Sequence, residues 1–235
     1  MQSIDQIRLS HGEGLNQETL DSLVRELQPQ KARFRPADKD EPLPLYDRQG
    51  QPLGLLAPRW ICHTLGLRHR CVQVFLLWES PALGETLILQ VRAWDRDDSP
   101  GYLDVSVGGH TTGASSDAVA AALKELREET GLQAEDLVSP LQPLGGYAID
   151  DPERPDEKLW NSEWRELFMG RLQPEMISKI HFQDGELAGL FLVPIRDARA
   201  LLKQSTLPLA SGLKHSLPRF LDSFRGLLRV PGQEQ

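Results

Sequence analysis

The chain has 235 residues, of which 40% are hydrophobic and 26% are charged, values typical of a folded globular protein. The formal net charge of −8 argues against a nucleic-acid partner, because phosphate backbones attract basic surfaces. No run of eighteen apolar residues and no secretory signal pattern is found, so we expect no membrane partner. The two cysteines, Cys62 and Cys71, are too few for a disulfide framework, which favours the cytoplasm.

The first forty residues differ from the rest of the chain in their pattern of apolar, charged and proline residues. Between Asn16 and Leu27, apolar side chains recur at helical spacing and predict one amphipathic helix: Leu20, Leu23, Val24 and Leu27. Residues 28–44 are rich in proline and charge and predict a linker. We therefore expect a helical extension and linker at 1–43 and one domain at 44–235. Since an isolated helix of this length is marginal in water, it is expected to pack on the domain or on a second copy in a homodimer.

From residue 45 onward, short β-like runs alternate with turns and helical segments. Residues 70–78 form the strongest predicted strand, and its nearly continuous apolar run indicates burial on both faces. Further strands are expected at 85–92, 103–107, 166–172 and 189–193, with a turn at 47–50. Helices are expected at 117–130, 196–203 and 217–228. Strands before and after a central helix predict an α+β fold with a mixed sheet.

The central helix has signals for both of its ends. Ser115 or Ser116 can cap its first turn, and Gly131 can end it in a left-handed conformation. Its predicted buried stripe consists of Val119, Ala122, Leu123, Leu126 and Thr130.

Three glutamates share another face of this helix: Glu125, Glu128 and Glu129. They repel one another, by about 3 kcal/mol for a pair ~6 Å apart at an effective dielectric constant near 20. A solvated acidic surface would tolerate this cost, and it is the interpretation that an isolated cluster favours. Hard cations such as Mg²⁺ or Mn²⁺, however, require such clusters of oxygen ligands.

The residues around this helix resemble the Nudix box, which has the pattern Gx5Ex7REUxEExGU with U aliphatic. The matching positions are Gly109 and the run from Lys124 to Leu132. The loop before Lys124 is one residue longer than the pattern, the first glutamate is absent, with Ser115, Ser116 or Asp117 near its place, and Lys124 replaces arginine. The resemblance implies an α/β/α sandwich around a mixed sheet and metal ligands at Glu125, Glu128, Glu129 and the Gly109 carbonyl.

Residues 46–54 resemble the opening hairpin of that superfamily, and residues 67–75, 89–92 and 99–110 are similar to one of its branches, the isopentenyl diphosphate isomerases and their hydrolase-like relatives. The isomerases bind a metal outside the helix, and His63, His69 and His110 match their three histidine positions. Glu163 matches one of their two glutamates, and Asn161 replaces the other. Cys62 and Cys71 are close in sequence to His63 and His69, and these four residues also suggest a zinc site. Their spacing, however, fits no standard zinc pattern.

Two features favour hydrolysis over isomerisation. The isomerases require a cysteine where this chain has Gly108, and their helix glutamates are degraded whereas those of this chain are intact. We therefore expect a cytoplasmic, Mg²⁺- or Mn²⁺-dependent hydrolase of a small-molecule diphosphate. The missing first glutamate and Lys124 motivate an alternative, a Nudix-fold sensor that binds a nucleotide-like ligand without turnover.

The resemblance also suggests roles for single residues. The general base is left open between a helix glutamate, such as Glu125 or Glu128, and a glutamate outside the helix, Glu163 or Glu186. Arg92 and Lys124 are candidates for binding substrate phosphate, and a plain surface role is as good an interpretation of Arg92.

Overall fold

The computed structural model describes residues 3–34, 39–96, 99–112, 117–151, 160–181 and 187–228. The chain divides into two compact units. Unit 1 comprises residues 1–72, 109–121 and 146–166, and unit 2 comprises residues 73–108, 122–145 and 167–235. Strands β3 (His69–Ser80), β7 (Gln142–Asp151) and β8 (Asn161–Arg171) and helix α4 (Ala118–Thr130) contribute residues to both units.

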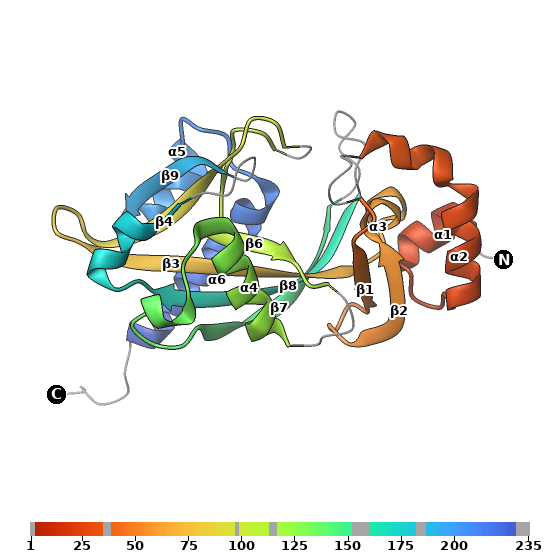
Figure 1. Cartoon of the computed structure of the whole chain (residues 1–235), viewed down its shortest axis with the longest axis horizontal. Helices are drawn as coiled ribbons and strands as arrows, with labels where there is room; N and C mark the ends of the chain where they lie inside the picture. Colours follow the sequence, from red (N-terminus) through yellow and green to blue (C-terminus); the bar gives the residue numbers. More distant parts are fainter. Residues whose placement is uncertain are drawn as a thin grey trace. The chain divides into compact units, whose positions relative to one another are not determined.

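Unit 1 is built on a β-hairpin and three short helices (Figure 1). Strands β1 (Pro42–Tyr46) and β2 (Pro52–Pro58) pair antiparallel, and Leu45 of β1 lies opposite His69 of β3. The predicted turn between them is confirmed, because the Asp47 side chain accepts hydrogen bonds from the backbone N–H groups of Gln49 and Gln51, both at 2.8 Å. Helix α3 (Arg59–Leu65), which was not predicted, follows β2 and is almost entirely buried.

The predicted N-terminal helix is confirmed as α2 (Gln17–Glu26), capped by the Asn16 side chain. It is preceded by α1 (Ile4–Ser10), which was not predicted. The predicted linker is wrong in part, because it contains the 3-10 helix η1 (Gln28–Arg33) and most of β1. Apolar side chains of α1 and α2 share a core with the hairpin and α3, including Ile7, Leu20, Leu23, Leu43, Leu45 and Trp60. The N-terminal helices therefore pack on their own chain, while the division at residue 43 stays a prediction.

This packing predicts a loss of stability on replacing Leu20 by alanine. Leu20 is fully buried, and a Leu→Ala change in a core costs about 2 kcal/mol or more. We expect the melting temperature to fall by about 4 °C or more, measured by circular dichroism. Leu9→Ala, at a position 82% exposed, is the matched control and should melt like the parent. Equal melting of both variants would show that the packing of α2 contributes nothing to stability.

Unit 2 contains the antiparallel pairs of β4 (Gly84–Arg92) with β3, β5 (Leu103–Asp104) and β9 (Leu187–Pro194). The predicted strand at 103–107 is divided between β5 and β6 (Val107–His110), and β7 was not predicted. Helix α6 (Ser211–Leu228) begins before its predicted start and packs on β3, where Phe220 stacks on Phe75 with ring centroids 4.3 Å apart. Short helical turns make up the rest: η2 (Ala134–Asp136), η3 (Pro174–Lys179), η4 (Ala198–Ala200) and α5 (Leu201–Gln204). Within the described residues, no helix is both long enough and apolar enough to span a bilayer.

Candidate functional site

Helix α4 carries the acidic cluster. Asp117 precedes it and accepts hydrogen bonds from the backbone N–H groups of Val119 and Ala120, at 3.0 and 3.1 Å. The predicted caps Ser115 and Ser116 lie outside the described residues. Gly131 ends the helix with φ +73°, as predicted. The predicted stripe is wrong at Val119, which is 40% exposed while the adjacent Ala118 is buried.

The three glutamates of α4 differ in their environments. Glu129 is buried, and its Oε2 accepts a hydrogen bond from the Gly108 N–H at 3.3 Å. The Glu125 side chain is 13% exposed and that of Glu128 is 41% exposed. The face is therefore not a uniformly solvated acidic surface, because two of its three carboxylates are largely withdrawn from water.

Lys124 places a positive charge within this cluster. Its Nζ lies 3.1 Å from Glu125 Oε1 and 2.8 Å from Glu128 Oε2. Partial burial lowers the pKa of Lys124, but the hydrogen bonds that it donates to Glu128 and Glu125 outweigh this effect and raise the pKa overall. Glu125 and Glu128 therefore approach one positive charge together.

Three further residues were predicted for this site: Arg92, Gly109 and Glu186. Arg92, at the end of β4, forms an ion pair with Asp104 of β5 at 2.9 Å, and its side chain is 15% exposed. Arg92 is thus held by a carboxylate, and its predicted role as a phosphate ligand stays a prediction. Gly109 lies in β6, and Glu186 is outside the described residues.

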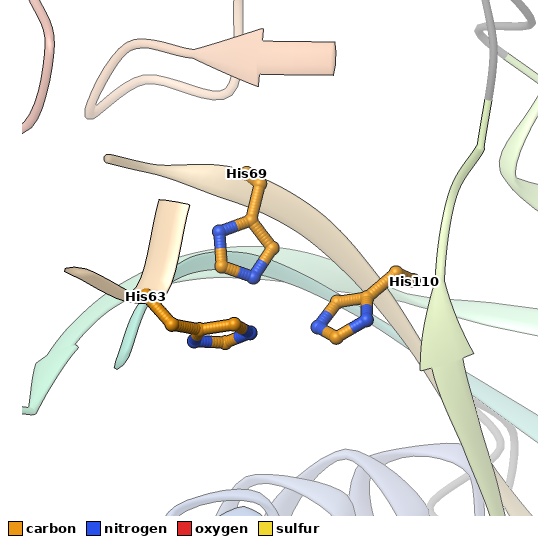
Figure 2. A group of neighbouring side chains, drawn as sticks. All are labelled: His63, His69 and His110. Carbon is orange, nitrogen blue, oxygen red and sulfur yellow. The ribbon is translucent and has the colours of Figure 1, made fainter. Parts of the chain in front are cut away.

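A second constellation lies in unit 1, where three histidines converge (Figure 2). His63 comes from α3, His69 from the start of β3 and His110 from the end of β6. One ring nitrogen from each lies within 4.8 Å of the others. Cys62 and Cys71 are buried, and within the described part of the chain neither joins this group.

The two more deeply buried imidazoles are held neutral. Burial lowers the pKa of His69 to about 3, and the nearby His110 adds to the shift. Burial likewise lowers the pKa of His63 well below its ordinary value, helped by His69 and Arg59. A neutral imidazole keeps a lone pair on one nitrogen, which is the form that binds metal ions.

Glu163 of β8 completes this group. Its Oε1 lies 3.9 Å from His69 Nε2 and 3.8 Å from His110 Nε2, and its Oε2 accepts a hydrogen bond from Arg165 Nε. Burial would raise the pKa of Glu163, but the adjacent Arg165 charge and the nearby His110 hold it well below its ordinary value. A carboxylate that stays ionised is a good ligand and a weak base, so these surroundings disfavour the predicted general-base role, which stays a prediction.

Arg165 and Glu41 also lie beside these residues and were not predicted from the sequence. Arg165 follows Glu163 by two residues on β8, and this period-two spacing, which places side chains on one face of a strand, was the available signal. Glu41 precedes β1, and its carboxylate lies 3.9 Å from His110 Nδ1. No sequence pattern indicates that contact.

Comparisons with known proteins agree on one family. The model of the NUDIX domain matches residues 67–218. Nudix hydrolase 3 of Arabidopsis thaliana is 26% identical over 167 residues, which are 70% of this chain and 21% of that protein. This chain therefore spans about a fifth of the length of that relative.

Solved structures are also similar to this chain. The structure of DR0079 from Deinococcus radiodurans is similar with a TM-score of 0.56 and 20% identity, covering 76% of this chain and 98% of that one. The NUDIX domain of Shewanella oneidensis NrtR, solved with ADP ribose, has a TM-score of 0.45 and 15% identity, covering 68% and 88%. The likeness to DR0079 confirms the predicted fold class, a mixed sheet with helices. The assignment to the isomerase-like branch stays a prediction.

Proposed function

Because the chain belongs to the NUDIX domain family, we propose that it hydrolyses a diphosphate linkage in a small molecule with the help of Mg²⁺ or Mn²⁺. The matched region contains the acidic face of α4. The observation that supports the proposal best is the Lys124 ammonium group between Glu125 and Glu128, because these two carboxylates approach one positive charge together.

In this proposal the chain's own residues bind and orient the reactants. Glu125, Glu128 and Glu129 hold the divalent ions, and the hydrogen bond from Gly108 restricts the orientation of Glu129. Bound there, the ions would supply positive charge to the diphosphate oxygens and activate the attacking water. Lys124, once displaced from the carboxylates, would donate to a substrate phosphate.

Lys124→Met tests the competition between the ammonium group and the metal. We expect Mg²⁺ to bind a few-fold more tightly, because exposed ion pairs of this kind contribute about 0.2–1 kcal/mol and the variant has none to break. The same variant should have a higher KM for the diphosphate substrate. Isothermal titration with Mg²⁺ and steady-state kinetics measure the two effects, and Lys214→Met, on exposed helix surface, is the control. Weaker Mg²⁺ binding would contradict the competition.

The proposed function is tested with a panel of substrates. The full chain is assayed for cleavage of nucleoside diphosphate sugars, dinucleoside polyphosphates, ADP ribose and prenyl diphosphates, with the phosphorylated products separated by chromatography, with Mg²⁺, with Mn²⁺ and with chelator. We expect turnover of at least one compound that requires metal. Saturable binding of a nucleotide with no turnover would support the sensor instead.

The converging histidines are the one observation that favours isomerase chemistry, and Gly108 opposes it because no thiol is present there. Isopentenyl diphosphate is therefore included in the panel. Its isomerisation, without hydrolysis of any compound, would overturn the proposal.

A further inference from the structure

The loop between β4 and β5 presents a tryptophan to solvent. Trp94 is 74% exposed, whereas Ala93 and Ser99 of the same loop are buried. Among the described residues, large apolar side chains are exposed at five other positions, and none of these lies in this loop. Exposed apolar residues are common on protein surfaces, so exposure alone assigns no role to Trp94. The way in which its ring is held is more informative.

One face of the Trp94 ring packs against Gly101. A Cβ atom added to Gly101 would lie 2.1 Å from Trp94 Cζ3 and 2.6 Å from both Cε3 and Cη2. An atom beside the edge of the ring would be farther from the two neighbouring carbons, so Gly101 lies against the face of the six-membered ring. Gly101 also has φ +73°, a conformation that favours glycine. The indole is therefore supported on one face and open to water on the other.

The base of this loop is closed by hydrogen bonds and an ion pair. The Gly101 N–H donates to the Arg92 carbonyl at 3.2 Å, and the Arg92 N–H donates to the Tyr102 carbonyl at 2.9 Å. The Arg92 side chain is paired with Asp104 at 2.9 Å. Because the ring is already held by this support, a planar ligand that stacks on it costs the protein little conformational entropy.

The loop is continuous with the acidic site of α4. Trp94, Gly108 and Glu129 belong to the same compact unit, and the Gly108 N–H donates to the Glu129 carboxylate. The seven residues from Gly101 to Gly108 span at most about 25 Å. Arg92, which the sequence predicts to bind phosphate, is only two residues from Trp94, a separation of at most about 7 Å. The open ring face thus lies beside the region in which a diphosphate is proposed to bind.

A single open aromatic face fits a nucleobase. A specific protein partner covers about 800 Å² of surface, far more than one indole face, and no second large apolar side chain is exposed among the described residues of this loop. A prenyl chain is flexible and not planar, so a flat, fixed ring offers it no particular complementarity. A nucleobase is planar and stacks on aromatic rings, with little dependence on which base it is.

We propose that Trp94 is a stacking platform for the nucleobase of the substrate and that Gly101 positions its ring. The substrates are then nucleoside diphosphate compounds, with broad tolerance for the base. This inference rests on the proposed function, because it places one end of a molecule whose diphosphate is bound at the α4 carboxylates.

Binding measurements test the platform without any turnover. The full chain is titrated in a calorimeter with ADP and, separately, with inorganic pyrophosphate, both in the presence of Mg²⁺. We expect Trp94→Ala to weaken ADP binding by at least about 10-fold and to leave pyrophosphate binding unchanged. Trp94→Phe should retain most of the ADP affinity, and Val138→Ala, at a position 56% exposed in the same unit, is the matched control. Parent-like ADP binding by Trp94→Ala, or no saturable ADP binding by the parent, would overturn the proposal.

Gly101→Ala tests the support of the ring. Its methyl group would occupy the position of the ring, so ADP binding should weaken as in Trp94→Ala while pyrophosphate binding is kept. Parent-like ADP binding by this variant would show that Gly101 does not position Trp94.

Steady-state kinetics distinguish failure of the platform from failure of the proposed function. For nucleotide substrates, Trp94→Ala should raise KM by about 10-fold with little change in kcat, because the base stacks equally in the ground state and the transition state. Prenyl diphosphates should show no such change. Binding of ADP through Trp94 without hydrolysis of any compound would refute the proposed function and retain the platform. Hydrolysis of nucleotides with a parent-like KM in Trp94→Ala would refute the platform and retain the function.

Discussion

Glu128→Gln is expected to lower kcat/KM for metal-dependent hydrolysis by at least about 100-fold, which corresponds to about 2.7 kcal/mol of transition-state stabilisation. The substitution removes one of the charges proposed to hold the divalent ion and leaves the side chain almost unchanged in size. Glu128 is also the most exposed of the three glutamates, so its side chain contributes little to the packing of the fold. Kinetics on the best substrate of the panel, at several Mg²⁺ concentrations, measure the effect.

Stability should change little in Glu128→Gln. The variant loses the ion pair with Lys124 but also a repulsion with Glu125, and exposed pairs of this kind contribute about 0.2–1 kcal/mol. The expected change in melting temperature is about 1–4 °C at most. Glu135→Gln, at an exposed acidic position of η2, is the matched control and should keep full activity. Parent-like activity of Glu128→Gln under saturating Mg²⁺ would remove the α4 carboxylates from the proposed mechanism.

Local signals in the sequence predict most of the helices and strands in residues 67–218, the region that the NUDIX domain model matches. Helix α4 begins one residue after its predicted start and ends at its predicted residue, because the glycine at position 131 takes a left-handed conformation that few other residues adopt readily. Strands β3 and β4 were predicted from apolar runs that few loops have. Helix α3 was missed because its six buried residues include Cys62, His63 and Thr64, and no polar face gives it a helical period.

Properties that depend on distant packing were not predictable in this way. The sequence places Val119 on the buried stripe of α4, but the structure leaves Val119 40% exposed and buries the adjacent Ala118. Periodicity gives the spacing of a buried stripe, and the neighbouring elements decide which residues occupy it. Glu129 is buried as well, and only the structure shows its hydrogen bond from Gly108.

The histidine cluster was predicted in part. The resemblance named three histidines and Glu163, which are separated by as many as 100 residues, and the structure places all four together. The partners that orient them are backbone carbonyls of Leu67 and Trp160, and a carbonyl is present at every residue, so no sequence pattern can point to those two. Arg165 differs, because its spacing from Glu163 on a strand was readable.

The largest expected loss of stability follows from Arg165→Met in metal-free protein. Glu163 and Arg165 are both buried, and removing one partner of a buried ion pair costs about 3–5 kcal/mol because the other charge is left uncompensated. At this chain length, the melting temperature should fall by about 6–20 °C. Arg171 lies at the end of the same strand as Arg165 and forms a partly exposed ion pair with Glu85 of β4. Arg171→Met is the matched control and should cost no more than about 1 kcal/mol.

The double variant Glu163→Gln/Arg165→Met distinguishes the effect of the uncompensated Glu163 charge on stability from the effect of lost side-chain packing. If the uncompensated carboxylate causes the loss, the double variant should be more stable than Arg165→Met alone, as measured by urea unfolding in chelator.

The pH dependence of stability provides a second check. In the parent, the lowered pKa of Glu163 adds stability above the unfolded-state value of about 4.3, and this stability is lost as the pH falls through the folded-state pKa. Without Arg165, burial raises that pKa, so folded Glu163 takes up a proton at a higher pH than in the parent. The difference in stability between parent and Arg165→Met should therefore narrow as the pH falls from 7 toward 4.5, and a difference independent of pH would assign the loss to packing alone.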